Sequence, residues 1–293
     1  MVKNNDEEVT VMKVRRSDRL VDMTRYLLER PRTLISLKFF AQRYDSAKSS
    51  ISEDLGILKR TFQDRGTGIL ETVPGAAGGA RFIPYILRED AQKFIEQIIH
   101  EVNDESRLLP GGYVYLSDLL SRPDVLRQVG RLIATQYLNQ DVDTVMTVAT
   151  KGIPIAQSVA TFLNVPFVIV RNDSHITEGS TVSVNYVSGS SKRIEKMELS
   201  RRSLKEGAHV LVVDDFMKGG GTLNGMASLI KEFDASLVGM TVFAEGEFSG
   251  EHRLVDHYTS LIKVNAVNPN DQTITAQPGN YLTTVFGKEM GSK

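Results

Sequence analysis

Two adjacent carboxylates and a run of glycines form the segment of this chain whose residue types best fit ligand binding. Asp214 and Asp215 directly follow the apolar run 210–213, and the glycines at 219–221 come a few residues later. Such an apolar run is typical of a buried strand in a parallel sheet, and open α/β sheets bind ligands beyond the carboxyl ends of these strands. Because glycine has no Cβ, the chain can turn tightly and point successive N–H groups at one anion. The segment therefore predicts an anion site beside two carboxylates.

The carboxylates must face a different part of the same ligand. They would repel a phosphate, so they are better matched to hydroxyl donors such as a ribose diol, or to a metal. Thr222 can cap a helix after the glycines, and helix N-termini bind phosphates. A diol and a phosphate together indicate a phosphorylated sugar. The segment lacks the GKS or GKT of a P-loop, and its acids precede its glycines, unlike those of a Rossmann turn.

The order of apolar run, acid pair, glycines and threonine resembles the motif with which type I phosphoribosyltransferases bind 5-phosphoribosyl-1-pyrophosphate (PRPP). The alternative is a glycine-rich strand-to-helix turn without a ligand. The resemblance implies that PRPP contacts the whole loop: Asp214, Asp215, Phe216, Met217, Lys218, Gly219, Gly220, Gly221 and Thr222. The position of Lys218 is commonly Asp, Ala or Thr in those enzymes, where an Asp can assist proton transfer. A lysine is a poor base there, so we expect binding without turnover and assign no catalytic residue.

Three further segments fit the same resemblance. The turn that follows the strand 144–148 resembles the loop that receives pyrophosphate, and it comprises Ala149, Thr150, Lys151 and Gly152. The segment 188–193 contains Lys192 and Arg193 and resembles the mobile loop that closes over PRPP, although a solvated turn would have the same composition. Tyr113, after the turn 110–112, could stack on a nucleotide base. We expect PRPP as an effector, alone or with Mg²⁺, and no metal site formed by the protein itself.

The length of the chain and its charge distribution indicate two domains. A chain of 293 residues exceeds the usual size of one domain, and we expect domains at residues 1–84 and 85–293. Residues 1–81 hold fifteen Lys and Arg against eleven Asp and Glu, whereas the whole chain has a net charge of −1. A polyanionic partner would suit the basic part, and so would a solvated basic face. The absence of Cys and of a long apolar run favours a cytoplasmic protein without a membrane segment.

Residue spacing in the first domain predicts three helices and then two strands. We expect helices from a cap at Ser17 and Asp18 to residue 28, from 34 to 44, and from a cap at Asp45 and Ser46 to about residue 62. Strands are expected at 69–73 and 80–83, which makes a winged helix-turn-helix with the third helix as recognition helix. A small protein-interaction domain or a dimerisation arm would have the same pattern. The residues expected to contact DNA are polar or cationic: Lys48, Ser49, Ser50, Ser52, Lys59, Arg60 and Arg81.

Helices and strands alternate in the second domain, as they do around a parallel sheet. Helices are expected at 89–101 and 122–139, and strands at 144–149, 166–170, 180–187, 194–199, 210–213, 237–244 and 258–264. The expected fold class is therefore α/β, with an N-terminal winged helix-turn-helix domain and a type I phosphoribosyltransferase-like parallel-sheet domain.

As a whole the chain resembles the bacterial purine operon repressor family, in which a winged helix is fused to a phosphoribosyltransferase-like domain. The resemblance implies a homodimer that binds a double-stranded DNA operator, represses purine synthesis genes and is released by PRPP as inducer. One alternative is an active purine phosphoribosyltransferase with an accessory N-terminal domain, and another is a protein-interaction module with a vestigial site. Whether a guanosine polyphosphate competes for the same pocket stays open at the level of the sequence.

Overall fold

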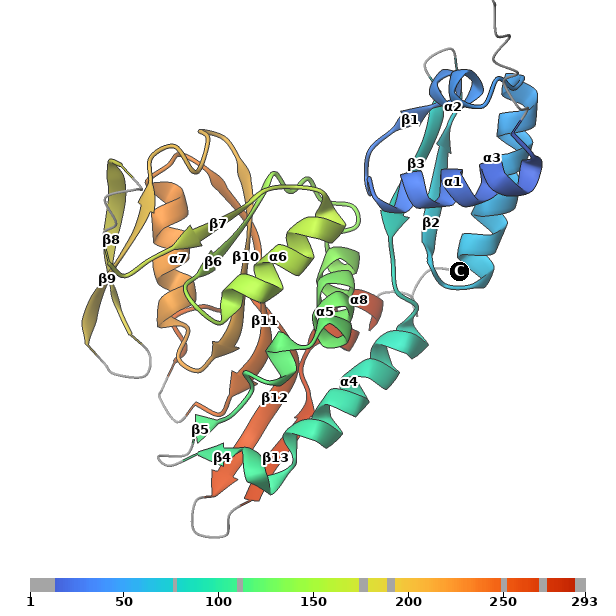
Figure 1. Ribbon diagram of the computed structural model, residues 1–293. Coiled ribbons are helices and arrows are strands. Elements are labelled where there is room, and N and C mark those ends of the chain that lie inside the picture. Colours follow the sequence, from blue (N-terminus) through green and yellow to red (C-terminus); the bar gives the residue numbers. More distant parts are fainter. Residues whose placement is uncertain are drawn as a thin grey trace, which may run out of the picture. The chain divides into compact units, whose positions relative to one another are not determined.

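The computed structural model describes residues 14–75, 78–109, 113–173, 179–188, 193–248, 252–268 and 273–287 (Figure 1). The chain divides into two compact units, the first ending at Ile83 and the second beginning at Pro84. This division lies immediately beside the boundary expected from the sequence. Among the described helices, none combines the length and the apolar character needed to cross a membrane.

The N-terminal unit is a winged helix with one strand more than expected. Its elements are α1 (Arg16–Leu28), β1 (Ile35–Ser36), α2 (Leu37–Arg43), α3 (Lys48–Asp64), β2 (Gly68–Val73) and β3 (Gly79–Pro84). The sheet has the order β1-β3-β2, with β1 antiparallel to β3. The apolar residues that predicted the third helix, Ile51, Leu55, Leu58 and Phe62, are all buried, so the expected core face of this helix is confirmed.

The expected helix starts in this unit were wrong. Helix α1 begins at Arg16, one residue before the expected cap at Ser17. Helix α3 begins at Lys48, after Ala47. The N-cap position of α3 is Ala47, whose side chain cannot accept a hydrogen bond, and the Ser46 hydroxyl donates to the carbonyl of Tyr44 at 3.0 Å. Helix α2 begins only at Leu37, since the two preceding residues pair with β3 and Ser36 accepts the cap hydrogen bond.

The second unit contains a mostly parallel sheet with the order β13-β12-β11-β10-β6-β7 among the described strands (Figure 1). The parallel strands are β6 (Thr144–Val148), β7 (Phe167–Val170), β10 (His209–Met217), β11 (Ser236–Gly246) and β12 (Thr259–Asn268), and β13 (Thr273–Pro278) runs antiparallel to β12. The helices are α4 (Arg88–Val102), α5 (Pro123–Gln136), α6 (Gly152–Leu163), α7 (Gly221–Lys231) and α8 (Tyr281–Phe286). The expected fold class is confirmed, whereas β13 and α8 were not expected.

Smaller elements lie outside the sheet. They are the 3₁₀ turns η1 (Glu105–Arg107) and η2 (Leu119–Ser121), the pair β4 (Leu108–Leu109) and β5 (Tyr113–Val114), and the hairpin β8 (Thr181–Val187) and β9 (Ile194–Ser200).

Both faces of the sheet are covered, and strand β10 shows this directly. Leu211 and Val213 belong to the core under α5 and α6, whereas Val210 and Val212 belong to the core under α7. Alternate residues of a strand point to opposite faces, so a strand buried on both faces reads as a continuous apolar run. The strand continues to Met217, because its pairing with β11 extends to that residue. The acid pair therefore lies within β10, and the expectation that the strand ends at residue 213 was wrong.

Candidate functional site

The acid pair and the 149–152 turn, which are far apart in the chain, lie side by side. Strands β6 and β10 are parallel neighbours, so their carboxyl ends meet at one edge of the sheet. A Cβ built on Gly152 would lie 2.1 Å from Thr147 Oγ1 and 3.0 Å from Asp214 Oδ1. Only a glycine fits at this contact. The structure thus brings together two of the segments that the sequence singled out.

The two carboxylates of the pair have different surroundings. Asp214 is 4% exposed, and its Oδ1 accepts the N–H of Asp215 at 2.9 Å. Burial raises the pKa of Asp214 well above its ordinary value, and the neighbouring charge of Asp215 raises it further. Asp215 is only partly buried. Of the two acids, Asp215 is the one that a ligand can reach, whereas Asp214 lies behind the turn.

The glycine loop ends in a helix N-terminus that is suited to an anion. Gly220 is the N-cap of α7 and has the left-handed angles φ 81° and ψ 7°, which disfavour other residues. Within the described part of the chain, no side chain caps this helix, so the N–H groups of its first turn are available to a ligand. Thr222 lies inside the helix and is not its cap, so that expectation was wrong. The backbone N–H groups of the loop suit an anion without a capping side chain, so the expected ligand chemistry is unchanged.

The other side chains of the loop divide between core and solvent. Met217 is buried in the core under α7, and Phe216 packs against the position of Gly246. At Met217 only the backbone can face a ligand, whereas Phe216 is partly buried. Lys218 is exposed, as are Thr150 and Lys151 in the neighbouring turn, and the two lysines give this edge positive charge. Among the described residues, no group of three or more His, Cys, Asp and Glu side chains is arranged to hold a metal ion.

A buried cluster that the sequence did not reveal supports the glycine loop. Glu245 lies opposite Met217 in the sheet and accepts hydrogen bonds from Tyr258 at 2.7 Å and Ser260 at 2.8 Å. Arg253 pairs with Glu245 and donates to the Gly246 carbonyl at 2.8 Å. The segment beginning at Arg253 then contacts the loop: the Leu254 N–H donates to the Gly219 carbonyl at 2.9 Å, and Val255 packs on Gly220. These residues belong to no local motif, so spacing could not have identified them.

The remaining predicted ligand residues lie on elements other than the glycine loop and the 149–152 turn. Arg193 is exposed between β8 and β9, directly before β9, and Lys192 lies outside the described residues. The hairpin itself packs on α7, since a Cβ at Gly225 would lie 2.6 Å from the Met197 methyl. Tyr113 is 66% exposed in β5, and the preceding residues 110–112 lie outside the described residues. The roles of these residues stay predictions.

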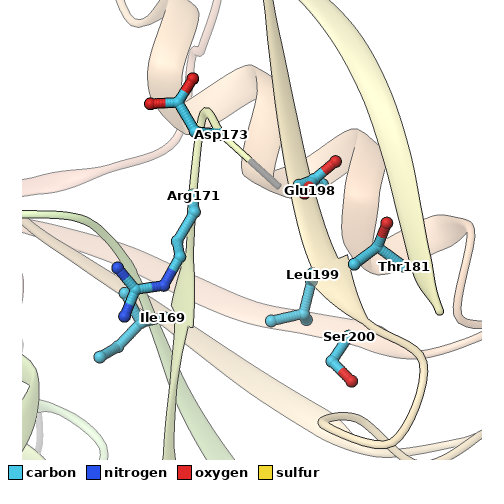
Figure 2. Close-up of a pocket in the computed structure, with 7 residues that line it drawn as sticks. All are labelled: Ile169, Arg171, Asp173, Thr181, Glu198, Leu199 and Ser200. Carbon is cyan, nitrogen blue, oxygen red and sulfur yellow. The ribbon is translucent and has the colours of Figure 1, made fainter. Parts of the chain in front are cut away.

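A small pocket lies between the end of β7 and β9 (Figure 2). It is lined by Ile169, Arg171, Asp173, Thr181, Glu198, Leu199 and Ser200. The backbones of Arg171 and Glu198 exchange hydrogen bonds at 3.0 and 2.8 Å, which ties the hairpin to the strand. Figure 2 shows the Arg171 side chain extending toward Ile169 and away from Asp173. None of the residues predicted to bind a ligand lines this pocket.

The predicted DNA-contacting residues of α3 form one exposed face. Lys48, Ser49, Ser52, Lys59 and Arg60 are exposed, and Ser50 is partly buried. The opposite face of the helix is anchored by a charge that the sequence analysis did not identify. Asp54 is fully buried and accepts from Arg16 at 2.8 Å and from Arg19 at 2.9 Å, which joins α3 to α1.

Arg81 differs from the other predicted contacts. It lies in β3 and pairs with Glu71 of β2 at 2.7 Å, with both side chains about half-exposed. The negative charge of Glu71 so close to Arg81 weakens the attraction of Arg81 for a DNA phosphate. We therefore expect Arg81 to contribute less to DNA affinity than Lys48 or Arg60.

Comparisons with known proteins identify both units. Residues 15–84 match the family described as "Bacterial purine repressor, N-terminal", and residues 116–279 match the phosphoribosyl transferase domain. The chain is 54% identical over 271 residues to the purine biosynthesis transcriptional repressor PurR of Bacillus subtilis, covering 92% of this chain and 95% of the relative. It is 53% identical to the purine biosynthesis transcriptional activator PurR of Lactococcus lactis, covering 92% and 99%. It is 54% identical to a probable purine biosynthesis transcriptional regulator PurR of Streptococcus pneumoniae, covering 92% and 98%.

Proposed function

The chain belongs to the bacterial purine repressor family, and from this premise we propose that it is a homodimeric transcriptional repressor of purine biosynthesis genes that PRPP releases from DNA. The observation that carries the effector part of the proposal is the meeting of the Gly152 turn, the acid pair and the uncapped start of α7 at one edge of the sheet. These are the groups that a phosphorylated ribose with a pyrophosphate would need.

Each part of PRPP has a partner of suitable chemistry. The N–H groups at the start of α7 bind the 5-phosphate, because no side chain of the described residues caps them and they lie at the positive end of the helix dipole. The exposed Lys151 and Lys218 attract the pyrophosphate. Asp215 accepts hydrogen bonds from the ribose hydroxyls, while the buried Asp214 supports it from behind. Mg²⁺ can accompany the pyrophosphate as part of the ligand.

The same site is unsuited to catalysis of nucleotide formation. Transfer of the ribosyl group to a purine requires a group that accepts or shares the proton of the base. Lys218 stands where such a group would act, and it is an exposed cation that donates hydrogen bonds. We therefore propose that PRPP is bound and not consumed. An assay of nucleotide formation from PRPP and purine bases distinguishes this from the enzyme alternative.

DNA binding is assigned to α3, whose exposed face carries hydroxyls and cations. In winged helices the recognition helix enters the major groove, so this face reads the operator. PRPP brings negative charge into the second unit and opposes DNA by changing the electrostatic potential or the pose of the winged helix. A tenfold loss of DNA affinity requires a coupling free energy of only about 1.4 kcal/mol.

The test is operator binding at fixed ionic strength with increasing PRPP. A duplex selected by the protein from randomised DNA serves as operator, and sodium chloride added to the same ionic strength controls for salt. We expect PRPP to weaken DNA binding at least tenfold. Tighter binding with PRPP would make it a corepressor, and no change would leave the site without a regulatory role. A guanosine polyphosphate added as a competitor shows whether another nucleotide uses the same pocket.

A further inference from the structure

The two residues that follow strand β3, Tyr85 and Ile86, are held by helix α5. The carbonyl of Tyr85 accepts hydrogen bonds from Nε and Nη2 of Arg131 at 2.9 and 2.6 Å. The N–H of Ile86 donates to Thr135 Oγ1 at 3.1 Å, and that hydroxyl donates to the carbonyl of Arg131 at 2.9 Å. The side chain of Ile86 is 1% exposed. The backbone is therefore fixed to α5 directly after β3 ends.

A partly buried arginine is a costly residue with which to hold the backbone at Tyr85. Burial lowers the pKa of Arg131, because a guanidinium withdrawn from water loses hydration, and the charge of Asp90 offsets this only in part. In return, the rigid fork of the guanidinium holds the Tyr85 carbonyl at two points. The contact thus specifies the direction of the backbone as well as its distance from the helix.

Helix α5 is in turn fitted closely to α6. A Cβ at Gly130 would lie 2.2 Å from Ser158 Oγ, so the helices cross with no room for a side chain at Gly130. The Ser158 hydroxyl donates to the carbonyl of Leu126 at 2.7 Å. Because closely packed helices with a specific polar contact cannot slide freely, α5 follows a displacement of α6.

Helix α6 begins in the proposed ligand site. Its first residue, Gly152, is the last residue of the turn assigned to pyrophosphate and lies against Thr147 and Asp214. The Thr147 hydroxyl is fully buried and has no hydrogen-bond partner among the described residues. No hydrogen bond from this hydroxyl therefore resists a movement of the 149–152 turn. A ligand that moves this turn therefore moves the first turn of α6.

We propose that Arg131 is the positioning residue through which a ligand at the 149–152 turn changes the pose of the backbone that leads into the winged helix. The path runs from the turn along α6, across the contact of Gly130 with Ser158 to α5, and through Arg131 and Thr135 to Tyr85 and Ile86. Every step is a contact within the second unit, and the final link is the covalent chain. This inference rests on the proposed function, because it explains how PRPP binding and DNA binding are coupled.

The test separates coupling from binding with a matched pair of full-length variants. Arg131→Gln removes the two-point contact with Tyr85, and Arg127→Gln makes the same change at an exposed residue one turn earlier on α5. For each protein three quantities are measured: the operator Kd without PRPP, the operator Kd with saturating PRPP, and the PRPP Kd by calorimetry. We expect Arg131→Gln to keep the first and third within about threefold while the effect of PRPP on DNA falls below about twofold. Arg127→Gln should behave as the wild type.

Two further variants guard against a merely structural effect. Arg131→Lys retains one donor to Tyr85 and should restore part of the coupling, whereas Thr135→Val removes the acceptor for the Ile86 N–H at nearly constant volume and should weaken it. Thermal unfolding confirms that each variant is folded. Full coupling in both Arg131→Gln and Thr135→Val would overturn this inference and leave the proposed function standing. A wild-type protein without any coupling would overturn the proposed effector, and this inference with it.

Discussion

Replacing Gly56 with alanine should make the N-terminal unit more stable and its binding to DNA weaker. Gly56 is exposed in the middle of α3, and a Cβ built on it meets no atom within 4 Å. Glycine in a helix interior costs about 0.8–1.0 kcal/mol relative to alanine. No contact in the described structure explains this cost. The free energy of unfolding should therefore rise by about 1 kcal/mol in Gly56→Ala, because the added methyl enters open space.

The loss of DNA affinity follows from the position of Gly56 on the helix. It lies four residues after Ser52 and four before Arg60, so the three residues share one face. This face is the one assigned to the major groove, where the helix backbone approaches the bases. A methyl at the point of closest approach would displace neighbouring contacts, each worth about 1–3 kcal/mol. We expect the operator Kd to rise at least tenfold.

Calorimetric unfolding of the full chain tests the expected gain in stability, and operator titration tests the expected loss of DNA affinity. For a unit of this size, 1 kcal/mol corresponds to a rise in Tm of about 4–8 °C. Gly287→Ala is the matched control, since it adds the same methyl in open space in the other unit and should leave DNA binding unchanged. A lower Tm in Gly56→Ala would refute the helix-propensity argument. A higher Tm with unchanged DNA affinity would remove Gly56 from the DNA interface.

Three further predictions concern the charges of the two units. Lys48→Ala and Arg60→Ala should each reduce the slope of log affinity against log salt by roughly one, measured by operator titration at several salt concentrations, and unchanged slopes in both would contradict the assigned face. Asp215→Asn should weaken PRPP binding more than tenfold by calorimetry with little effect on DNA affinity without ligand, because a hydrogen bond to a charged acceptor is worth about 1.5–3 kcal/mol. Arg43 holds the pKa of Asp22 down to about 2 from 3.8, so this pair stabilises the folded unit above pH 3.8 and loses that effect as the pH falls toward 2. Thermal melts across this range should show a smaller acid loss in Asp22→Asn, and an equal loss would assign the effect to other groups.

Local patterns in the sequence determined most of the secondary structure and the chemistry of the site. The recurrence of apolar residues from Ile51 to Phe62 predicts the recognition helix, because one face of a helix repeats every three or four residues. The order of acids and glycines after an apolar run predicts an anion site, because glycine frees the backbone and the acids exclude phosphate from their own position. Both patterns involve only residues that are neighbours in the chain, so they can be recognised before the fold is known.

Only the tertiary structure decided which polar side chains are buried and which pair. Nothing local in the sequence distinguishes Asp214 from Asp215, and they differ because folding buries Asp214, with Gly152 from another strand end against it, and leaves Asp215 partly exposed. Glu71 neutralises Arg81 across two strands, and the contact of Arg131 with Tyr85 joins residues 46 positions apart. Burial and pairing depend on groups that folding brings together from distant parts of the chain, and no periodicity within a segment records them.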